Sequence, residues 1–337
     1  MDSHGKMQLP YPQLSLYVSD LIRVKGFDPL RASVANRRFM ISQIELEQRA
    51  DAAYRLLEAC RVCPRECGVD RLKDDKGGFC RSGLNPVISS VSPHHGEEPP
   101  LSGTKGSGTI FFTNCNLRCM YCQNYPISQL GNGAERTPGE LACQMMWLQE
   151  QGCHNVNLVT PTHFVPQVLR ALGIARERGF SLPIVYNTSG YDSIETLRLL
   201  DGIVDIYLPD MRYSDNAAAM RYSVAPHYAD VNREAVREMY RQVGNLVLDG
   251  QGIAKRGLII RHLVLPGGLS GTEGVMKFLA EEISKDVSIS LMAQYFPAYR
   301  AKDHPEINRR ITEQEYDEAY DIKIKYGLKN GWVQEFE

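Results

Sequence analysis

The chain has 337 residues, of which 43% are hydrophobic and 23% are charged, as is typical of a soluble globular protein. Its 38 basic and 40 acidic side chains nearly balance, so composition gives no electrostatic argument for binding nucleic acid or an anionic membrane. No apolar run approaches the length of a membrane span, and the polar start, residues 1–7, lacks a signal-peptide core. We therefore expect a cytoplasmic protein.

The first part of the chain has few structural signals. Residues 1–40 contain prolines at positions 10, 12 and 29 and are expected to form an irregular arm. Residues 42–59 predict a helix, because apolar side chains recur there at helical spacing: Ile44, Ala53, Leu56 and Leu57.

A cysteine-rich segment, residues 60–80, follows this helix. Residues 82–107 are rich in Ser, Pro and Gly and are expected to form a connecting loop. We accordingly divide the chain into an N-terminal arm, helix and metal-binding segment (1–100) and a core (101–337).

In the core, short apolar runs alternate with longer helix-patterned stretches. The runs predict six strands, at 109–112, 156–160, 183–187, 203–208, 258–265 and 287–294. The first helix should begin at Thr137, because Pro138 and Glu140 complete a capping pattern, and it should stop before Gly152.

Alternating strands and helices predict a parallel sheet. Six units favour an α/β fold with a partial (β/α)6 TIM-like barrel over a two-domain dinucleotide fold. No G-x-G-x-x-G follows any predicted strand, which agrees with this preference. In such a barrel the chemistry lies at the C-terminal ends of the strands.

Three cysteines follow the first predicted strand, T-I-F-F, in the loop T-N-C-N-L-R-C-M-Y-C-Q-N (113–124). Structural zinc normally takes four ligands, and iron–sulfur clusters also favour four cysteines. Three cysteines at a strand end therefore suggest a cubane cluster whose fourth iron is free for a substrate or cofactor. The alternative is a zinc site completed by a distant histidine. The three residues are Cys115, Cys119 and Cys122.

The motif C-N-L-R-C-M-Y-C resembles the signature of radical S-adenosylmethionine (SAM) enzymes. The longer stretch G-T-I-F-F-T-N-C-N-L-R-C-M-Y-C-Q-N resembles the pyruvate formate-lyase activating enzyme branch, and the likeness extends through I-R-H-L-V-L-P-G (260–267). With a cysteine segment ahead of the core, the chain is most similar to the uncharacterised activating-enzyme-like iron–sulfur proteins.

The resemblance implies that the three core cysteines hold a [4Fe–4S] cluster, whose fourth iron is chelated by the amino and carboxylate groups of SAM. It also implies reduction of the cluster by an electron donor such as flavodoxin or ferredoxin, under anaerobic conditions. SAM is then cleaved to methionine and a 5′-deoxyadenosyl radical, which abstracts hydrogen from a substrate. Such chemistry is that of an oxidoreductase or lyase, and the cofactors supply it.

In the family, the second strand usually ends in a Gly-Gly-Glu motif that binds the SAM amino group. Here the matching stretch is L-V-T-P-T-H-F, which offers Thr160, Thr162 and His163. Hydroxyl and imidazole groups can accept a hydrogen bond from an ammonium, so these residues are candidates for the same contact. A helix cap is the alternative role of Thr162.

The third and fourth strands also end in polar residues. Asn187 and Ser189 resemble the pair that contacts the ribose or carboxylate of SAM, with a turn before Gly190 as the alternative. Asp210 and Arg212 follow the fourth strand and are candidates for contact with the SAM carboxylate or a substrate. A surface ion pair is the alternative for these two.

The sequence also suggests roles for three further residues. Tyr121 occupies the position that packs near adenine in the family. Arg261 and His262 are adjacent on the fifth strand, so strand alternation points only one of them into the barrel. We expect His262 to be a structural histidine.

A second group of cysteines has the spacing C-x2-C-x3-C-x12-C and predicts a closed metal site that fixes a short segment: Cys60, Cys63, Cys67 and Cys80. Zinc and a [4Fe–4S] cluster suit this spacing equally. Zinc would be structural, whereas a cluster could relay electrons to the first site. A redox pair of Cys60 and Cys63 is a third interpretation, which leaves two cysteines unexplained.

The sequence thus predicts a radical SAM enzyme, without identifying a catalytic residue of the protein itself. A glycyl-radical activase would act on a glycine of a partner protein and needs an open groove. An enzyme that modifies a peptide or small molecule needs a closed pocket. The missing Gly-Gly-Glu and the extra cysteine segment argue against a standard activase. A zinc or iron–sulfur scaffold without catalysis is the alternative from another functional class.

Overall fold

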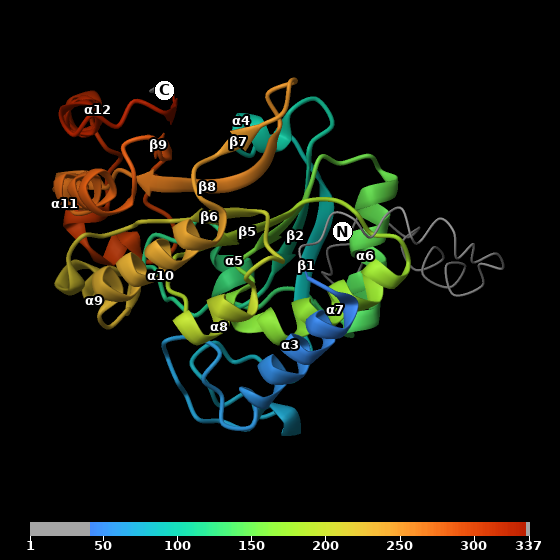
Figure 1. The fold of residues 1–337 in the computed structure, drawn as a ribbon. Coiled ribbons are helices and arrows are strands. Elements are labelled where there is room, and N and C mark those ends of the chain that lie inside the picture. Colours follow the sequence, from blue (N-terminus) through green and yellow to red (C-terminus); the bar gives the residue numbers. More distant parts are fainter. Residues whose placement is uncertain (1–40, 335–337) are drawn as a thin grey trace, which may run out of the picture.

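The computed structural model describes residues 41–334, so the arm expected at 1–40 lies outside the described residues. Within them, one sheet runs through the whole molecule, and its strands are separated by helices (Figure 1). The strands are β1 (Val87–His94), β2 (Ser107–Phe112), β3 (Ala134–Glu135), β4 (Val156–Val159), β5 (Ile184–Thr188), β6 (Ile206–Pro209), β7 (Val247–Leu248), β8 (Ala254–Leu263), β9 (Ser288–Met292) and β10 (Gly331–Val333).

The sheet has the order β10-β9-β8-β6-β5-β4-β2-β1-β3, and β7 pairs with β8 beside this path. The strands β2, β4, β5, β6, β8 and β9 are the six that the sequence predicts, and they pair in parallel. A short seventh strand, β10, joins β9 in parallel. The two end strands of the described sheet, β10 and β3, do not pair with each other, so the predicted partial barrel is confirmed.

Helices cover the outer side of this sheet (Figure 1). They are α3 (Gln43–Arg55), α4 (Pro99–Ser102), α5 (Tyr125–Ser128), α6 (Pro138–Glu150), α7 (Val165–Glu177), α8 (Ile194–Leu199), α9 (Asn216–Ser223), α10 (Tyr228–Val243), α11 (Thr272–Phe278) and α12 (Glu313–Lys325). Shorter helical turns are η1 (Arg71–Lys73), η2 (Thr162–Phe164), η3 (Pro266–Gly268), the π-helical η4 (Leu279–Ile283), η5 (Ala301–Asp303) and η6 (Pro305–Ile307).

Local signals place the helix boundaries well. The Thr137 hydroxyl accepts from the Glu140 amide while the Glu140 carboxylate accepts from the Thr137 amide, which is the predicted capping box. In the first predicted helix, Ala53, Leu56 and Leu57 are buried as expected, but the placement of Ile44 on the apolar face is wrong. Ile44 is 69% exposed, and the buried face consists of Leu46, Ala50 and Ala53. These three recur at the i, i+4, i+7 spacing of one helix face, from which Ile44 is turned away.

The prediction of a connecting loop at 82–107 is also wrong, because this stretch contains β1 and α4. Of the residues of β1, only Ile88 is buried, so the strand carries almost no apolar pattern. Antiparallel pairing with β2, from Ile88 to His94, provides its main-chain hydrogen bonds instead.

The concave face of the sheet changes character along the strands. A small apolar cluster fills one end, where a leucine from α4 packs against strand residues: Leu101, Val185, Ile206, Leu208, Ala254 and Ile259. Because side chains on one face recur every second residue, the same face continues to Asn187, Asp210 and Arg261 toward the carboxyl ends of the strands. The polar end of the interior is therefore the end at which the sequence predicts the chemistry.

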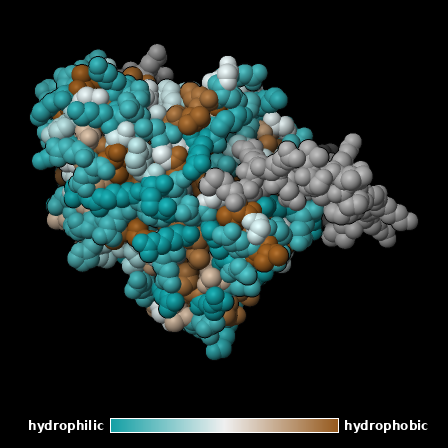
Figure 2. Space-filling view, in the orientation of Figure 1, coloured by the Kyte–Doolittle hydropathy of each residue, from teal (hydrophilic) through white to brown (hydrophobic). Residues whose placement is uncertain are grey.

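The outer surface in Figure 2 is mostly hydrophilic, and apolar residues form separate patches on it. Large exposed apolar side chains come from distant elements, as Ile44, Met220 and Phe296 illustrate. No helix among the described residues is long and apolar enough to span a bilayer.

Gly190 is required where β5 leads into the site. Its φ is +73°, and a Cβ there would lie 2.4 Å from the carbonyl oxygen of Asp210 and 2.1 Å from the Asn232 side-chain nitrogen. An alanine at position 190 loses stability both from its positive φ and from the clash of its Cβ. We expect the clash to lower the free energy of unfolding of Gly190→Ala by a further amount of about 1–3 kcal/mol. Gly179→Ala is the matched control, since Gly179 has a φ of +89° and open space around it. Equal urea midpoints for the two variants would contradict the expected clash.

Candidate active site

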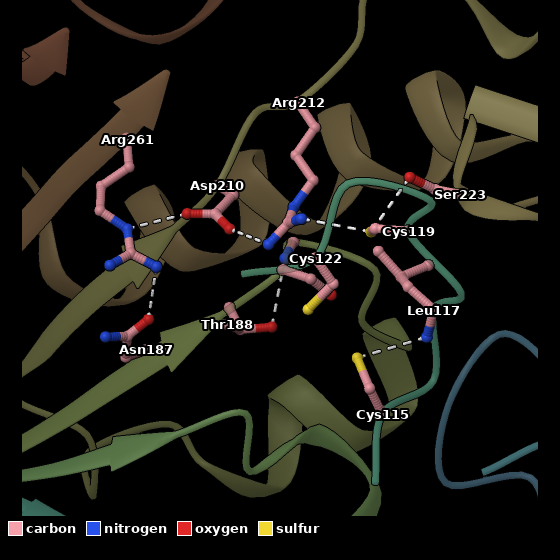
Figure 3. A network of polar contacts seen from close by, with 12 residues as sticks. Cys115, Leu117, Cys119, Cys122, Asn187, Thr188, Asp210, Arg212, Ser223 and Arg261 are labelled. Atoms are coloured by element: carbon pink, nitrogen blue, oxygen red, sulfur yellow. Dashed lines mark hydrogen bonds and ion pairs between the residues drawn. The ribbon is translucent and has the colours of Figure 1, made fainter. Parts of the chain in front are cut away.

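The three-cysteine loop begins directly after β2, as predicted. It is fastened to the end of α9, because the amides of Arg118 and Met120 donate to backbone carbonyls there at 2.9 and 2.7 Å. Figure 3 shows the loop carrying the cysteine side chains beside the polar strand ends. Two of its cysteines are buried and one is half-buried: Cys115, Cys119 and Cys122, in that order.

Hydrogen-bond donors point at the sulfur atoms. The Ser223 hydroxyl lies 3.1 Å from the Cys119 Sγ, and the Arg212 Nη1 lies 3.3 Å from the same atom (Figure 3). The amide of Leu117 donates to the Cys115 Sγ at 3.4 Å. Donors in these positions stabilise a thiolate, which is the form of cysteine that binds metals.

Burial opposes the thiolate form of Cys115 when no metal is bound. Burial raises the pKa of Cys115 to about 12, with further contributions from Cys119 and Cys122. Coordination to a metal removes such protons outright. Within residues 41–334, no three His, Cys, Asp or Glu side chains converge as closely as a single metal ion requires. A cubane cluster makes a different demand, because each thiolate binds its own iron atom, so the donor set fits such a cluster.

A buried carboxylate connects the strand ends to this loop. Asp210 Oδ1 accepts from Arg261 Nε at 2.8 Å, and its other oxygen accepts from Arg212 (Figure 3). Burial alone would raise the pKa of Asp210, but Arg261 and Arg212 together hold it below its usual range. Asp210 is 6% exposed, so the alternative of a surface ion pair is wrong. Arg261 also donates to Asn187 Oδ1 at 2.7 Å, which joins β5, β6 and β8 in one network.

Ser189 and Tyr121 flank this network. The Ser189 hydroxyl is buried and has no hydrogen-bond partner among the described residues, although the Ser189 carbonyl accepts from Tyr228 at 2.8 Å. The Tyr121 hydroxyl lies 2.7 Å from that of Tyr213, and its ring lies 5.5 Å from the ring of Tyr295. A buried hydroxyl without a partner is a group that a bound ligand can satisfy.

The residues after β4 lie in two different surroundings. Thr160, at a φ of +60°, is half-buried at the end of the strand. Thr162 is buried, and its hydroxyl donates to Asp192 Oδ1 at 2.7 Å and lies 3.0 Å from the Thr188 hydroxyl. It is not the cap of α7, since Phe164 occupies that position, so the helix-cap interpretation is wrong. Sequence analysis overlooked Asp192, which also accepts from Tyr186 and Thr188 of β5.

His163 faces the N-terminal cysteines. Its Nε2 lies 3.0 Å from the Thr113 carbonyl, and its own carbonyl accepts from Arg71 at 2.7 Å. Burial lowers the pKa of His163 to about 3, so the ring is neutral and Nε2–H is the donor to Thr113. His163 lines one pocket with all four cysteines of the N-terminal segment. The structure thus places it against the predicted second metal site.

His262 has the structural role that we expected. Its Nδ1 lies 2.7 Å from the Met211 carbonyl, and its Nε2 lies 3.0 Å from the Thr272 hydroxyl. Burial lowers the pKa of His262 to about 4, so the neutral ring donates through Nδ1 and accepts through Nε2. The alternating pleat turns the neighbouring Arg261 to the interior.

A third polar group, which sequence analysis missed, faces Arg261 from the segment before α4. Glu97 and Glu98 both interact with the Arg261 guanidinium. Asn157, on β4, lies beside Glu97 and is fully buried, yet neither of its amide atoms has a hydrogen-bond partner within the described residues. Burial raises the pKa of Glu97 to about 7 against the opposing effect of Arg261. No local pattern marks these residues, because they meet only through the fold.

Known proteins share this framework. The sequence profile of the radical SAM superfamily matches residues 109–243, from β2 to the end of α10. An uncharacterised protein of Methanocaldococcus jannaschii is 31% identical over 293 residues, which make up 84% of this chain and 79% of that protein.

Two solved structures are similar at a lower level. A domain of the pyruvate-formate lyase-activating enzyme from Bacteroides vulgatus has a TM-score of 0.35 and 14% identity, and the match covers 59% of this chain and 91% of that one. The FeFe-hydrogenase maturase HydG from Carboxydothermus hydrogenoformans has a TM-score of 0.46 and 11% identity, covering 65% of this chain and 50% of that one. The core cysteine loop, Asn187 and Asp210 all lie within the region that the superfamily profile matches.

Because Asp210 is buried between two arginines, removing its negative charge should greatly reduce the stability of the protein. We expect Asp210→Asn to lower the free energy of unfolding by about 3–5 kcal/mol, because the half-buried guanidiniums of Arg212 and Arg261 lose their buried counter-charge. Asp51→Asn is the control, since the pair of Asp51 with Arg170 is exposed and should contribute about 1 kcal/mol or less. Denaturant unfolding of both variants measures the difference, and similar losses would show that Asp210 is not the centre of the network.

Proposed function

Because the chain belongs to the radical SAM superfamily, we propose that it is a SAM-cleaving enzyme whose [4Fe–4S] cluster is bound by Cys115, Cys119 and Cys122. The observation that carries the proposal is the placement of the three thiols after β2, with Arg212 and backbone donors directed at their sulfur atoms. When bound, the cluster and SAM supply a 5′-deoxyadenosyl radical that takes a hydrogen atom from a substrate.

The residues proposed to hold SAM lie around the Asp210 network. Ser189 Oγ and Arg212 Nε are buried and lack hydrogen-bond partners among the described residues, so we favour these two for direct contact. Asn187 and Asp210 position Arg261 and Arg212 beside them. Thr160 remains a candidate for the SAM ammonium, whereas the internal bonds of Thr162 support an indirect role through Asp192.

Aromatic side chains would keep water away from this chemistry. Tyr121, Tyr213 and Tyr228 are buried, and the Tyr213 and Tyr228 rings lie edge to face at 5.6 Å. They stand between the cysteine loop and the helices that follow β6. A dry site strengthens every charge interaction within it and protects reactive species from side reactions.

The charge of the barrel interior favours a cationic substrate. Glu97, Glu98 and Asp210 carry three carboxylates in this region, against the two guanidiniums of Arg212 and Arg261. When Glu97 is ionised, one of these carboxylates lacks a counter-charge among the five groups, so a nearby cation would favour the ionised form. The adjacent amide atoms of Asn157 make no close hydrogen bond within the described residues. An ammonium or guanidinium group, on a small molecule or on a lysine or arginine of a peptide, would satisfy both. An activase that acts on the glycine of a partner protein is the second candidate, supported by the unclosed sheet.

Removal of the core thiols tests the proposed chemistry. We expect the variant Cys115→Ala/Cys119→Ala/Cys122→Ala to form no 5′-deoxyadenosine from SAM under dithionite, because no thiolate remains to bind the cluster. Chromatography of anaerobic reactions measures this product. Cys143→Ala removes another buried cysteine outside both cysteine groups and should retain the activity. Product formed by the triple variant would refute the assignment, and a wild type without product would favour the non-catalytic scaffold.

The cationic substrate has a separate test. Amines, guanidines, neutral amides and acids of similar size are screened for stimulation of 5′-deoxyadenosine formation. We expect cationic compounds to stimulate, and Glu97→Gln/Glu98→Gln to raise the concentration for half-stimulation about tenfold or more, since a charged hydrogen bond contributes about 1.5–3 kcal/mol. Glu58→Gln, at an exposed glutamate of the outer surface, is the control. Stimulation only by a glycine-containing partner protein would favour the activase instead.

A further inference from the structure

The four N-terminal cysteines come together in the fold. Cys60, Cys63, Cys67 and Cys80 line one pocket, whose wall also includes Arg71. Cys67 is half-buried and the other three cysteines are buried. The segment that carries them lies at the edge of the molecule beside α3 and α8, in blue to teal in Figure 1. Thiols that are 20 residues apart in the chain thus face a common space.

This segment has little other support for its conformation. Between the end of α3 and the start of β1, a stretch described throughout, the three-residue η1 is the only helix or strand. Two backbone bonds tie the first cysteine, from Cys60 N to Val69 O and from Gly68 N to Cys60 O. All nine cysteines of the chain are free thiols, so no disulfide fixes the segment. A bound metal centre supplies such stability in short segments.

The buried guanidinium of Arg71 favours a negatively charged group in the pocket. Arg71 is fully buried, and it donates to the carbonyls of Gly83 and His163 rather than to a carboxylate. Its Nη1 lies 3.9 Å from the Cys60 Sγ, and its Nη2 has no partner among the described residues. A buried cation requires a counter-charge. Four thiolates around zinc or a [4Fe–4S] cluster would supply a net charge of about −2.

The pocket adjoins the core cysteine loop. The Phe79 ring, next in sequence to Cys80, is covered by Arg65 at 3.6 Å and by Arg118 at 4.8 Å. Arg65 donates to the carbonyl of Asn116, and Arg118 donates to the carbonyl of Phe79. Both guanidiniums interact with thiols of the pocket and with Cys115. One layer of side chains therefore separates the two groups of cysteines.

We propose that Cys60, Cys63, Cys67 and Cys80 hold a second [4Fe–4S] cluster, which relays electrons to the core cysteines past Phe79. Half-buried Cys67 provides the entry side, and Cys80 provides the exit side. One electron enters from a one-electron donor protein and leaves toward the core, so the pocket is restored and no atom is transferred. Zinc has no redox chemistry and could not act in this way. The relay rests on the proposed SAM cleavage, whereas the metal site itself does not.

Metal analysis tests the site independently of activity. The variant Cys115→Ala/Cys119→Ala/Cys122→Ala, purified anaerobically, should retain about four irons per chain and lack stoichiometric zinc. The wild type should contain about eight irons. One zinc per chain would overturn the proposed cluster, and absence of metal would overturn the site. If the triple variant does not fold, the iron content of the wild type decides the question. About four irons per chain, with or without zinc, would contradict a second cluster.

Electron paramagnetic resonance of the fully reduced wild type tests the relay. Two clusters separated by one side-chain layer should couple magnetically, which broadens and splits the signal. The triple variant, with one cluster, should give a simple signal of a single reduced centre. A wild-type spectrum that is the plain sum of two uncoupled signals would overturn the relay. If the iron count and the coupled spectrum are as expected but the wild type does not cleave SAM, the proposed function is refuted and the second cluster stands.

Discussion

A single buried carboxylate fixes the geometry on which the site depends. Asp210 is held between Arg261 and Arg212, and neither arginine can move without leaving a charge uncompensated inside the protein. Arg261 carries the constraint to Asn187 on β5, and Arg212 carries it to Cys119 in the metal-binding loop. The strand ends and the cysteine loop thus share one electrostatic centre, so the positions of the cofactor groups follow from the burial of this charge.

Much of the fold could be predicted from the sequence because its determinants are local. Parallel strands buried on both faces appear as continuous apolar runs, and the capping box at Thr137 marks a helix start directly. The strand β1 could not be found in this way, since its stability comes from pairing with β2 and only Ile88 is buried. In α3 the neighbour α7, more than 100 residues away, determines which face is covered, so Ile44 was misplaced.

In the candidate site, too, residues that are close in sequence could be predicted and residues that meet only through the fold could not. The core cysteines lie within eight residues, so their spacing identifies them without any knowledge of the fold. Arg71 and His163 are 92 residues apart and Arg261 and Asn187 are 74 apart, and no local pattern connects such partners. Thr162 illustrates the limit of argument by position. Its hydroxyl was a reasonable acceptor at a strand end, but the fold brings Asp192 against it.

The unclosed sheet has a consequence for behaviour in concentrated solution. An open edge offers free N–H and C=O groups to strands of other molecules and is a common route to aggregation. Here the edge strands β3 and β10 have only two and three residues, and Glu135 places a charge on the first. Beyond the two residues of β1 that pair with β3, the edge of β1 includes Pro93, which has no N–H to donate to another strand. The sheet can therefore stay unclosed while its edges remain poor templates for pairing with other molecules.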